Sequence, residues 1–354
     1  MVARADTASL AVPRERSLAP RLLLVLPLLG ALIYPALTAG LYASGRWASA
    51  HPSLISYLVV LAGLLAVFSV PFYGFVAAYR IGRLAAPTVG EHFMRVLYHL
   101  VAASPPLFGA FGMASVMLGS SYGDYVAWFV VWTAIAVYAY DRTVDSRPFI
   151  PRVLARPALR VSHGTSAAIL ILIFIAAHLG NHMTAIWSLD AHSMILKTLR
   201  LWYRTEFVEP LIVTLLLFQA VSGLTLLLAR LGEQSDLYRV IQTVTGTYLA
   251  VYIPAHITAV FVLGRWFYGI DTGTGFVFLK HGYFPSLFNI RFIAHYWLAA
   301  FAVITHAGSG LRNILLAHHA SCVIANRTLV AVAITGFVVA TTIALALCGV
   351  HLAS

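Results

Sequence analysis

Histidines inside apolar segments are the residues of this sequence with the clearest chemistry. The segment 160–184 is apolar enough to cross a bilayer, yet it contains His163, His178 and His182. An ionisable side chain is costly to bury in lipid, so it marks a functional site by default. Neutral imidazole is an axial ligand of haem iron. The pattern predicts a haem held between this segment and a second histidine at the same depth.

His256 supplies that second histidine. With a rise of about 1.5 Å per residue, His178 lies roughly 24 Å and His256 roughly 20 Å from the cytoplasmic ends of their helices. The two helices are predicted to run in the same direction, so both imidazoles occupy one layer in the outer half of the membrane. A lone histidine is more often a packing residue than a ligand. The matched depth favours the ligand pair.

A second haem is left open. The segment 291–316 carries His295 near the outer layer and His306 in the cytoplasmic half. The candidate partners of His306 are Gln219, which is a poor iron ligand, and His163. The sequence therefore predicts one haem b, with a second at His306 and His163 as an open alternative.

The other histidines have simpler interpretations. His182, one helical turn after His178, could line the same face or meet interfacial water, and the second interpretation is favoured. His99 is expected to be a packed or hydrogen-bonded residue. The remaining ones fall in loops or at helix ends, where solvated histidines need no further explanation: His51, His92, His192, His281, His318, His319 and His351.

Composition places the chain in the membrane class. Sixty per cent of the 354 residues are hydrophobic and only 10% are charged, which lies outside the range of soluble proteins. The net charge of +11 is then read as basic loops that orient helices, not as a nucleic-acid surface. Cys322 and Cys348 form no CxxC motif, which argues against an iron–sulfur cluster or a zinc site in this chain. No carboxylate falls in the middle of an apolar segment, unlike in most proton-coupled pumps.

The predicted fold is all-α and polytopic, because about 20 apolar residues cross the hydrocarbon. Nine apolar segments have a suitable length: 22–43, 53–78, 93–118, 124–140, 162–184, 208–229, 243–266, 291–316 and 328–350. Arginines gather before the first segment, after the second and after the fourth. The positive-inside rule then places the N-terminus in the cytoplasm of a bacterial-type or organellar inner membrane.

Four regions are predicted from these features. Residues 1–20 form a basic tail, 21–141 a four-helix membrane region, 142–160 a basic cytoplasmic linker, and 161–354 a five-helix haem-binding bundle. Between the fifth and sixth segments, apolar and charged residues alternate with near-helical spacing. This pattern predicts a short helix lying in the outer interface.

The last five segments resemble the membrane cytochrome b subunit of succinate dehydrogenase and fumarate reductase, in its five-helix form. The resemblance covers about 158–354 and is carried by three motifs in the right order: RVSHGTSAAILILIFIAAHLGNH, QTVTGTYLAVYIPAH and HAGSGLRNILL. It implies that His178 and His256 hold the outer haem. In that family a histidine on the second helix helps to hold an inner haem, but this chain has Gln219 there. The four N-terminal segments lie outside the family pattern.

The resemblance implies a membrane b-type cytochrome that moves electrons between a partner and the quinone pool. It is expected to be an electron-transfer subunit rather than a stand-alone enzyme, with flavoprotein and iron–sulfur subunits as candidate partners. Candidate residues of a haem or quinone pocket are Tyr203, Arg204 and Glu206 on the outer side and Arg160, Ser162 and His163 on the inner side. Two alternatives stay open: a haem- or quinone-based sensor or assembly anchor without turnover, and a haem-free transporter that uses histidines. The sequence leaves the oligomeric state undetermined.

Overall fold

The computed structural model describes residues 18–150, 156–278 and 282–353, which form helices and the turns between them. Within these ranges there is no β-strand, and the one extended pairing is an isolated bridge between Thr88 and Pro148. The all-α prediction is confirmed. Most of the predicted tail 1–20, part of the predicted linker 142–160, and His281 lie outside the described residues.

Every predicted apolar segment is helical within the described ranges. Six of the helices are unbroken: α1 (Leu18–Ala50), α2 (Leu54–Gly82), α5 (Gly123–Arg142), α9 (Val208–Arg230), α12 (Arg291–Ala317) and α13 (Cys322–Leu347). The others combine shorter pieces: α3 (Val89–Ala102) with α4 (Ser104–Met117), α6 (Pro157–Leu170) with η1 (Ile171–Ile175) and α7 (Ala176–Thr184), and α10 (Leu237–Ile257) with η2 (Thr258–Phe267). Both η segments are π-helical.

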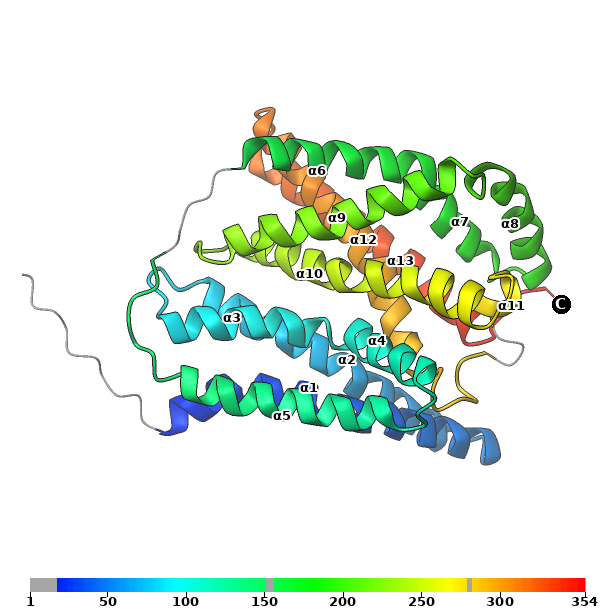
Figure 1. Cartoon of the computed structure of the whole chain (residues 1–354), viewed down its shortest axis with the longest axis horizontal. Coiled ribbons are helices and arrows are strands. Elements are labelled where there is room, and N and C mark those ends of the chain that lie inside the picture. Colours follow the sequence, from blue (N-terminus) through cyan, green and yellow to red (C-terminus); the bar gives the residue numbers. More distant parts are fainter. Residues whose placement is uncertain (1–17, 151–155, 279–281, 354) are drawn as a thin grey trace, which may run out of the picture.

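Two further helices lie between these long ones. The amphipathic α8 (Leu189–Tyr203) falls where a short interfacial helix was predicted, and its first turn is capped by the Ser188 side chain, which accepts a hydrogen bond from the Ala191 N–H. The short α11 (Thr274–Val277) follows η2 and was not predicted. It lies against α8 (Figure 1).

The described part of the chain has six helices long and apolar enough to cross a membrane, and seven if the bent pair α3–α4 is one span. The chain is therefore a multi-pass helical membrane protein, but the predicted count of nine is not reached by this measure. The two helices that fall short are α5 and α12. Both carry charged residues, and α12 also carries His295 and His306, which lower its mean hydropathy.

The third predicted segment is one bent unit rather than a straight helix. Its two halves meet at an angle of 65°. Pro105 and Pro106 stand just after the bend and have no N–H with which to continue the helical hydrogen bonding. The Ser104 hydroxyl donates to the Val101 carbonyl at 2.8 Å, which supplies the bond that the Pro105 nitrogen cannot make.

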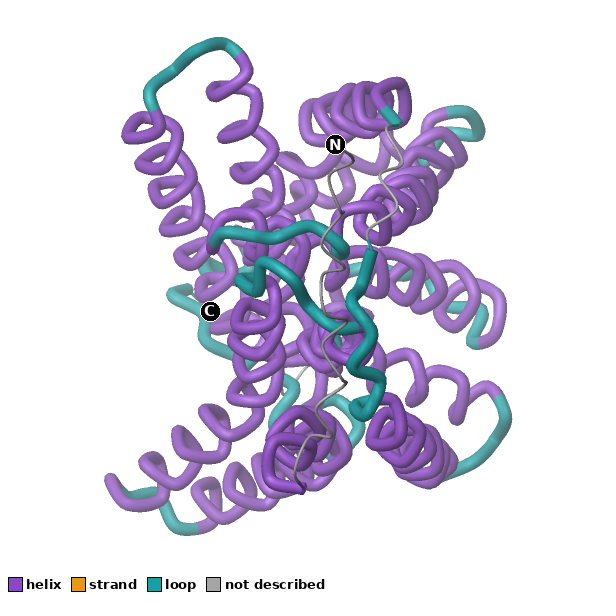
Figure 2. The backbone as a smooth tube through the Cα atoms, turned by 90° about the vertical axis from the view of Figure 1, so that its left-hand side faces the viewer, coloured by secondary structure: helices purple, strands orange, loops and turns teal. Residues whose placement is uncertain are grey.

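The basic loops gather at one end of the bundle, at the left of Figure 1 and toward the viewer in Figure 2. Backbone hydrogen bonds join these loops: Val89 N–H donates to Arg147 O at 2.9 Å, and Ser235 N–H donates to Gly82 O at 2.7 Å. The α2–α3, α5–α6 and α9–α10 connections therefore share one end. At the opposite end the C-terminal residues cross the α7–α8 turn, where Leu352 N–H donates to Ile186 O at 2.8 Å.

The N-terminal and C-terminal helices are joined by a buried ion pair. Arg291 at the start of α12 donates to Asp124 at the start of α5 at 2.5 Å, and the two side chains are only 3% and 4% exposed. The guanidinium also lies over the Phe108 ring. One hydrophobic core continues from α1–α5 into α10, α12 and α13. The N-terminal helices therefore pack against the helices that carry the histidines.

Candidate functional site

A cavity of about 410 Å³ runs between α6–η1–α7, α9, α10–η2 and α12. Its volume is that of small-molecule and cofactor sites in general. We call the end of the cavity near the basic loops its inner end and the opposite end its outer end. Arg160 and Arg230 line the inner mouth. Its outer mouth is lined by Arg204 and Arg265. Apolar side chains cover most of the wall between the two mouths, and histidines face the cavity at both ends.

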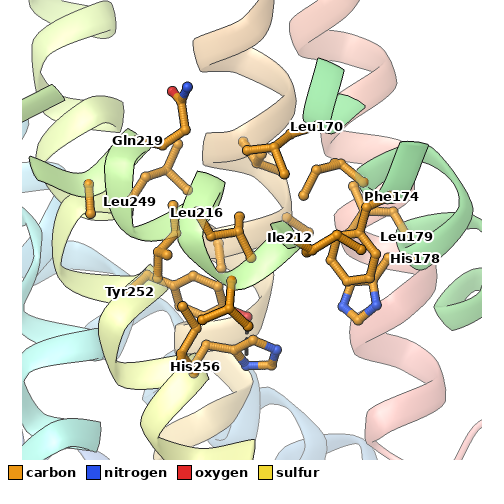
Figure 3. Close-up of a pocket in the computed structure, with 18 of the residues that line it drawn as sticks. Leu170, Phe174, His178, Leu179, Ile212, Leu216, Gln219, Leu249, Tyr252 and His256 are labelled. Carbon is orange, nitrogen blue, oxygen red and sulfur yellow. Dashed lines mark hydrogen bonds between the residues drawn. The ribbon is translucent and has the colours of Figure 1, made fainter. Parts of the chain in front are cut away.

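The outer end of the cavity holds His178 and His256. Their ring centroids lie 6.2 Å apart and their planes meet at 67°. Figure 3 shows the two rings at a similar level on different helices, with Ile212 and Leu216 beside them. A π-helical segment stands next to each ring, since η1 ends three residues before His178 and η2 begins two residues after His256. Such segments are frequent at functional sites.

The inner end of the cavity holds His163 and His306. Their ring centroids lie 6.5 Å apart and their planes meet at 86°. These two residues were the open alternative for a second haem. The structure brings them together across the cavity in the same way as the outer pair.

Both separations match the spacing of two imidazoles on opposite sides of one metal ion. With a metal–nitrogen bond of about 2 Å and a ring radius of about 1.2 Å on each side, the centroids stand about 6.4 Å apart. The observed values are 6.2 Å for the outer pair and 6.5 Å for the inner pair. Among the described residues, no three histidine, cysteine or acidic side chains are placed to hold a metal ion by themselves. Two facing imidazoles suit a metal that brings its own equatorial ligands.

A hydrogen bond to Ser222 orients the His163 ring. Its Nδ1 lies 2.8 Å from the Ser222 hydroxyl oxygen, and that hydroxyl also lies 2.5 Å from the Phe218 carbonyl oxygen. Assigning the hydroxyl proton to the Phe218 carbonyl makes Ser222 the acceptor and places the His163 proton on Nδ1. Its Nε2 is left with a free lone pair and has no hydrogen-bond partner within the described ranges.

The same arrangement holds His306. Its Nδ1 lies 3.1 Å from the Gln242 carbonyl oxygen and 3.2 Å from the Thr245 hydroxyl. The Thr245 proton goes to the Ile241 carbonyl at 2.7 Å, so both neighbours of Nδ1 accept. His306 Nε2 is therefore also a lone pair. Metal-bound histidines almost always donate their other N–H in this way.

Glycines make room for the two inner rings. A Cβ on Gly246 of α10 would lie 2.9 Å from His306 Cε1, and a Cβ on Gly223 of α9 would lie 3.3 Å from His163 Cε1. Any larger residue at Gly246 would push the His306 ring from its place. These two glycines thus let imidazole rings lie close to the neighbouring backbones.

Gln219 does not occupy a ligand position. Its side-chain nitrogen donates to the His163 carbonyl at 2.9 Å and to the Ser166 hydroxyl at 2.5 Å. These bonds fasten α9 to α6. Gln219 also lies away from the two outer histidines in Figure 3. The structure places His163 of α6 beside His306. The resemblance instead places the partner ligand on α9, at the position of Gln219.

The outer pair is part of a larger group of histidines. The His182 ring lies 4.6 Å from that of His178 and stacks on His192 at 5.4 Å. His182 Nδ1 and His192 Nε2 are buried without a hydrogen-bond partner among the described residues. The expectation that His192 is solvated is therefore wrong, and His182 lines the cavity beside His178. His192 is buried because α11 and Phe278 cover it: its Nδ1 lies 2.9 Å from the Thr274 hydroxyl.

Hydrogen bonds hold the outer pair less firmly than the inner pair. The closest polar neighbour of His256 Nδ1 is the Tyr252 hydroxyl at 3.4 Å, a long contact between residues one turn apart. No hydrogen bond to His178 is formed within the described residues. The rings are instead flanked by aromatic neighbours, with Phe174 stacked on His178 and Tyr252 stacked on His256.

Four of the six candidate pocket residues from the sequence line the cavity, and one of them is His163 at its inner end. Arg160 stands at the inner mouth, and Tyr203 and Arg204 stand at the outer mouth. Ser162 and Glu206 are exposed and do not line it. Ser162 is therefore not brought to the site, because its side chain points out of the bundle on the far side of α6.

Carboxylates neutralise the arginines of the outer mouth. Arg265 makes two hydrogen bonds to Glu209, each of 2.8 Å, and Asp271 accepts from Arg204 at 2.6 Å and from Arg200 at 2.7 Å. The bonds from Arg204 and Arg200 hold the pKa of the Asp271 carboxyl below its usual value. On α8, burial lowers the pKa of His192 to about 4, and Arg200 adds to the effect. Burial also raises the pKa of Tyr203.

The two remaining deep histidines lie outside the cavity lining. Both ring nitrogens of His99 are bonded, Nδ1 to the Arg95 carbonyl at 2.8 Å and Nε2 to the Thr243 hydroxyl at 3.1 Å. The interpretation of His99 as a hydrogen-bonded packing residue agrees with this. His295 is buried beside Tyr252 and Tyr296. Neither histidine faces a partner imidazole across open space.

Comparison with family models, with curated proteins and with solved structures found no match to this chain.

Proposed function

We propose that this chain is a membrane b-type cytochrome that carries electrons between a partner and the quinone pool. One observation supports the proposal above all others: two pairs of imidazoles line one apolar cavity, with centroid separations that suit axial ligands of iron. In this proposal His178 and His256 bind an outer haem b, and His163 and His306 bind an inner one. The proposal agrees with the resemblance to the succinate dehydrogenase and fumarate reductase cytochrome b subunit. It differs in one ligand, because His163 takes the role that the family gives to a histidine at the position of Gln219.

The haem supplies one-electron chemistry, and the chain's own residues supply the rest. His163 and His306 arrive with their protons on Nδ1 and their Nε2 lone pairs free, so no proton has to leave when the metal binds. Arg160 and Arg230 at the inner mouth provide positive charge for the carboxylates of a haem or for quinone oxygens. The apolar walls keep water away from the metal.

In this proposal the nine predicted segments all cross the membrane, including the bent α3–α4 pair and the more polar α5 and α12. If nine segments cross in alternating directions, every second loop must lie on the same side of the membrane. The α2–α3, α5–α6 and α9–α10 loops do lie at one end, which supports this arrangement. The α2–α3 and α5–α6 loops carry arginines, so that end faces the cytoplasm by the positive-inside rule. The N-terminus is then cytoplasmic, and the outer histidines lie toward the opposite side.

Absorption spectra and haem content of the purified full-length protein test the ligand assignment. We expect two haem b per chain. His163→Ala or His306→Ala should remove the inner haem, and His178→Ala or His256→Ala the outer one, so each change halves the haem content. His318→Ala is the matched control, because His318 is exposed at the end of α12 and should leave both haems in place.

Absence of a reduced-minus-oxidised band would remove the cytochrome proposal and favour the haem-free transporter. Full haem content in His163→Ala together with loss of all haem in His178→Ala would show that the inner pair binds no haem. If haem is present, addition of a reduced quinol separates an electron carrier from a sensor or anchor. An electron carrier becomes reduced by quinol, whereas a haem-based sensor or assembly anchor without quinone chemistry does not.

A further inference from the structure

A second pocket, of about 290 Å³, opens at the basic end of the bundle beside the inner mouth of the cavity. It lies between the last turn of α9, the first turns of α10 and the last turns of α12. Three arginines line it, Arg230, Arg239 and Arg312, together with Tyr238 and Asn313. Arg230 also lines the cavity, but Arg239 and Arg312 line only this pocket. None of these pocket residues has a role in the proposed iron coordination.

The positive charge of the pocket is only partly balanced by the protein. Arg239 pairs with Glu233 at 2.9 Å. Within the described ranges no carboxylate lies at ion-pair distance from Arg230 or Arg312. Arg230 donates to the neutral Gln242 side chain at 3.2 Å, and Arg312 Nε donates to the neutral Asn326 side chain at 2.8 Å. Two of the three guanidiniums therefore keep their full charge.

The one acidic residue in the lining does not neutralise them. Asp236 is the N-cap of α10, and its side-chain oxygen accepts a hydrogen bond from the Arg239 backbone N–H at 2.8 Å. A carboxylate at this position accepts a hydrogen bond from a free backbone N–H group and interacts with the positive end of the helix dipole. The charge of Arg230 and Arg312 is left for something outside the protein.

Arg312 is held in a position to bind an anion. Its Nε bond to Asn326 fixes one edge of the guanidinium, and its flat face lies over the Tyr238 ring at 4.3 Å from the ring centroid. Its two Nη groups have no hydrogen-bond acceptor among the described residues, and Arg312 lines the pocket. A guanidinium fixed by one edge and one face has little conformational freedom left to lose when it binds. Such a side chain is well prepared for an oxyanion.

We propose that this pocket binds a phosphate group, either the headgroup of an anionic phospholipid from the adjacent leaflet or a free phosphate ion. Arginine is the preferred partner of phosphate, because its donors match two phosphate oxygens at once. Basic pockets between membrane helices on the cytoplasmic side are typical sites for anionic lipid headgroups. This inference does not depend on the proposed haem, because Arg312 stands outside the histidine cavity.

Melting of the purified full-length protein in a neutral detergent, with haem content recorded on the same samples, tests this inference. The probes are phosphatidylglycerol, phosphatidylcholine and inorganic phosphate, each titrated separately. We expect phosphatidylglycerol to raise the melting temperature and phosphatidylcholine to have no such effect. A rise with inorganic phosphate at similar concentrations would identify free phosphate as the ligand instead.

Variants at Arg312 show whether the effect comes from this pocket. Arg312→Gln removes one unpaired guanidinium and should weaken the apparent affinity about tenfold or more, because charge-assisted hydrogen bonds are lost. Arg312→Lys keeps the charge but not the two-pronged geometry, and it should fall between the wild type and Arg312→Gln. Arg327→Gln is the matched control, since Arg327 is an exposed arginine on the neighbouring α13 that does not line the pocket.

Two results would overturn the inference. The first is no difference between phosphatidylglycerol, phosphatidylcholine and phosphate in the wild type. The second is an equal loss of affinity in Arg327→Gln and Arg312→Gln, which would indicate binding to general surface charge. Haem content should be the same in all of these variants, so failure of the phosphate site and failure of the proposed cytochrome function remain separate outcomes.

Discussion

The two ends of the histidine cavity are built differently. At the inner end, Ser222 and Gln242 fix the proton positions of His163 and His306, and Arg230 has no carboxylate partner among the described residues. At the outer end, His178 belongs to a group of stacked aromatic rings with no hydrogen bond that fixes its proton. The arginines of the outer mouth are bound by Glu209 and Asp271.

This difference indicates two ways of preparing a site. The inner imidazoles are oriented before any ligand arrives, and the charge around them is left open to an anionic group. The outer imidazoles depend on packing for their orientation. Beside them, one ion pair joins α8 to the segment after η2 and another joins α9 to η2. A ligand at the inner end should therefore depend on hydrogen bonds to the histidines. The outer end should depend on the ion pairs that close it.

Removal of Glu209 should have the largest effect at the outer end. Glu209 binds Arg265 through two charge-assisted hydrogen bonds of 2.8 Å, and both side chains are about three-quarters buried. We expect Glu209→Ala to lower the free energy of unfolding by about 2–3 kcal/mol, because it leaves a largely buried guanidinium unpaired. Thermal melting of the purified protein measures this loss.

Glu206→Ala is the control for Glu209→Ala. Glu206 lies three residues earlier, between α8 and α9, and it is exposed and makes no ion pair within the described residues. Its removal should change stability by less than about 0.5 kcal/mol. Equal effects of the two changes would mean that the Arg265 pair does not close the outer mouth in the way described.

Ser222→Ala should have the next largest effect, and it should act at the inner end of the cavity only. The change removes the acceptor of the His163 N–H and should weaken haem binding at the inner site about 10- to 100-fold, as loss of such supporting bonds does at other metal sites. The matching change at the outer site is Tyr252→Phe. It removes a contact of 3.4 Å, so it should weaken the outer site by less than about threefold.

Haem titration of each variant, with the two sites distinguished by their spectra, measures these affinities. A larger loss in Tyr252→Phe than in Ser222→Ala would reverse the comparison, because it would show that hydrogen bonding matters more at the outer end. Equal small losses would show that neither hydroxyl orients a ligand.

The positions of the long helices could be predicted from the sequence, because the bilayer sets both their length and their apolarity. The segment predicted at 291–316, for example, is the helix Arg291–Ala317. The bend between α3 and α4 was missed, although Pro105 and Pro106 signal it, because the apolar run continues through them. The π-helical segments give no pattern in the sequence.

The site could be predicted only in part. Depth along parallel helices placed His178 and His256 in one layer, since a constant rise per residue carries that information. It could not choose between Gln219 and His163 as the partner of His306, because that choice depends on how each helix is rotated about its axis. The burial of His192 depends on α11, which folds over it from a segment some 80 residues away in the sequence. Such long-range contacts leave no local signal.

Asp271 should give the smallest effect, and one that depends on pH. Its bonds to Arg204 and Arg200 depress the pKa of the carboxyl, so the stabilisation is present above the unfolded value of about 3.9 and is lost as the pH falls through the lower folded value. The side chain is 64% exposed, so each pair should contribute only about 0.2–1 kcal/mol. Asp271→Asn should lower the melting temperature slightly at about pH 6, and the difference should shrink as the pH falls below about 4. A difference that persists unchanged at the lower pH would mean that Asp271 acts through packing rather than through its charge, and the outer mouth would then be closed by Glu209 alone.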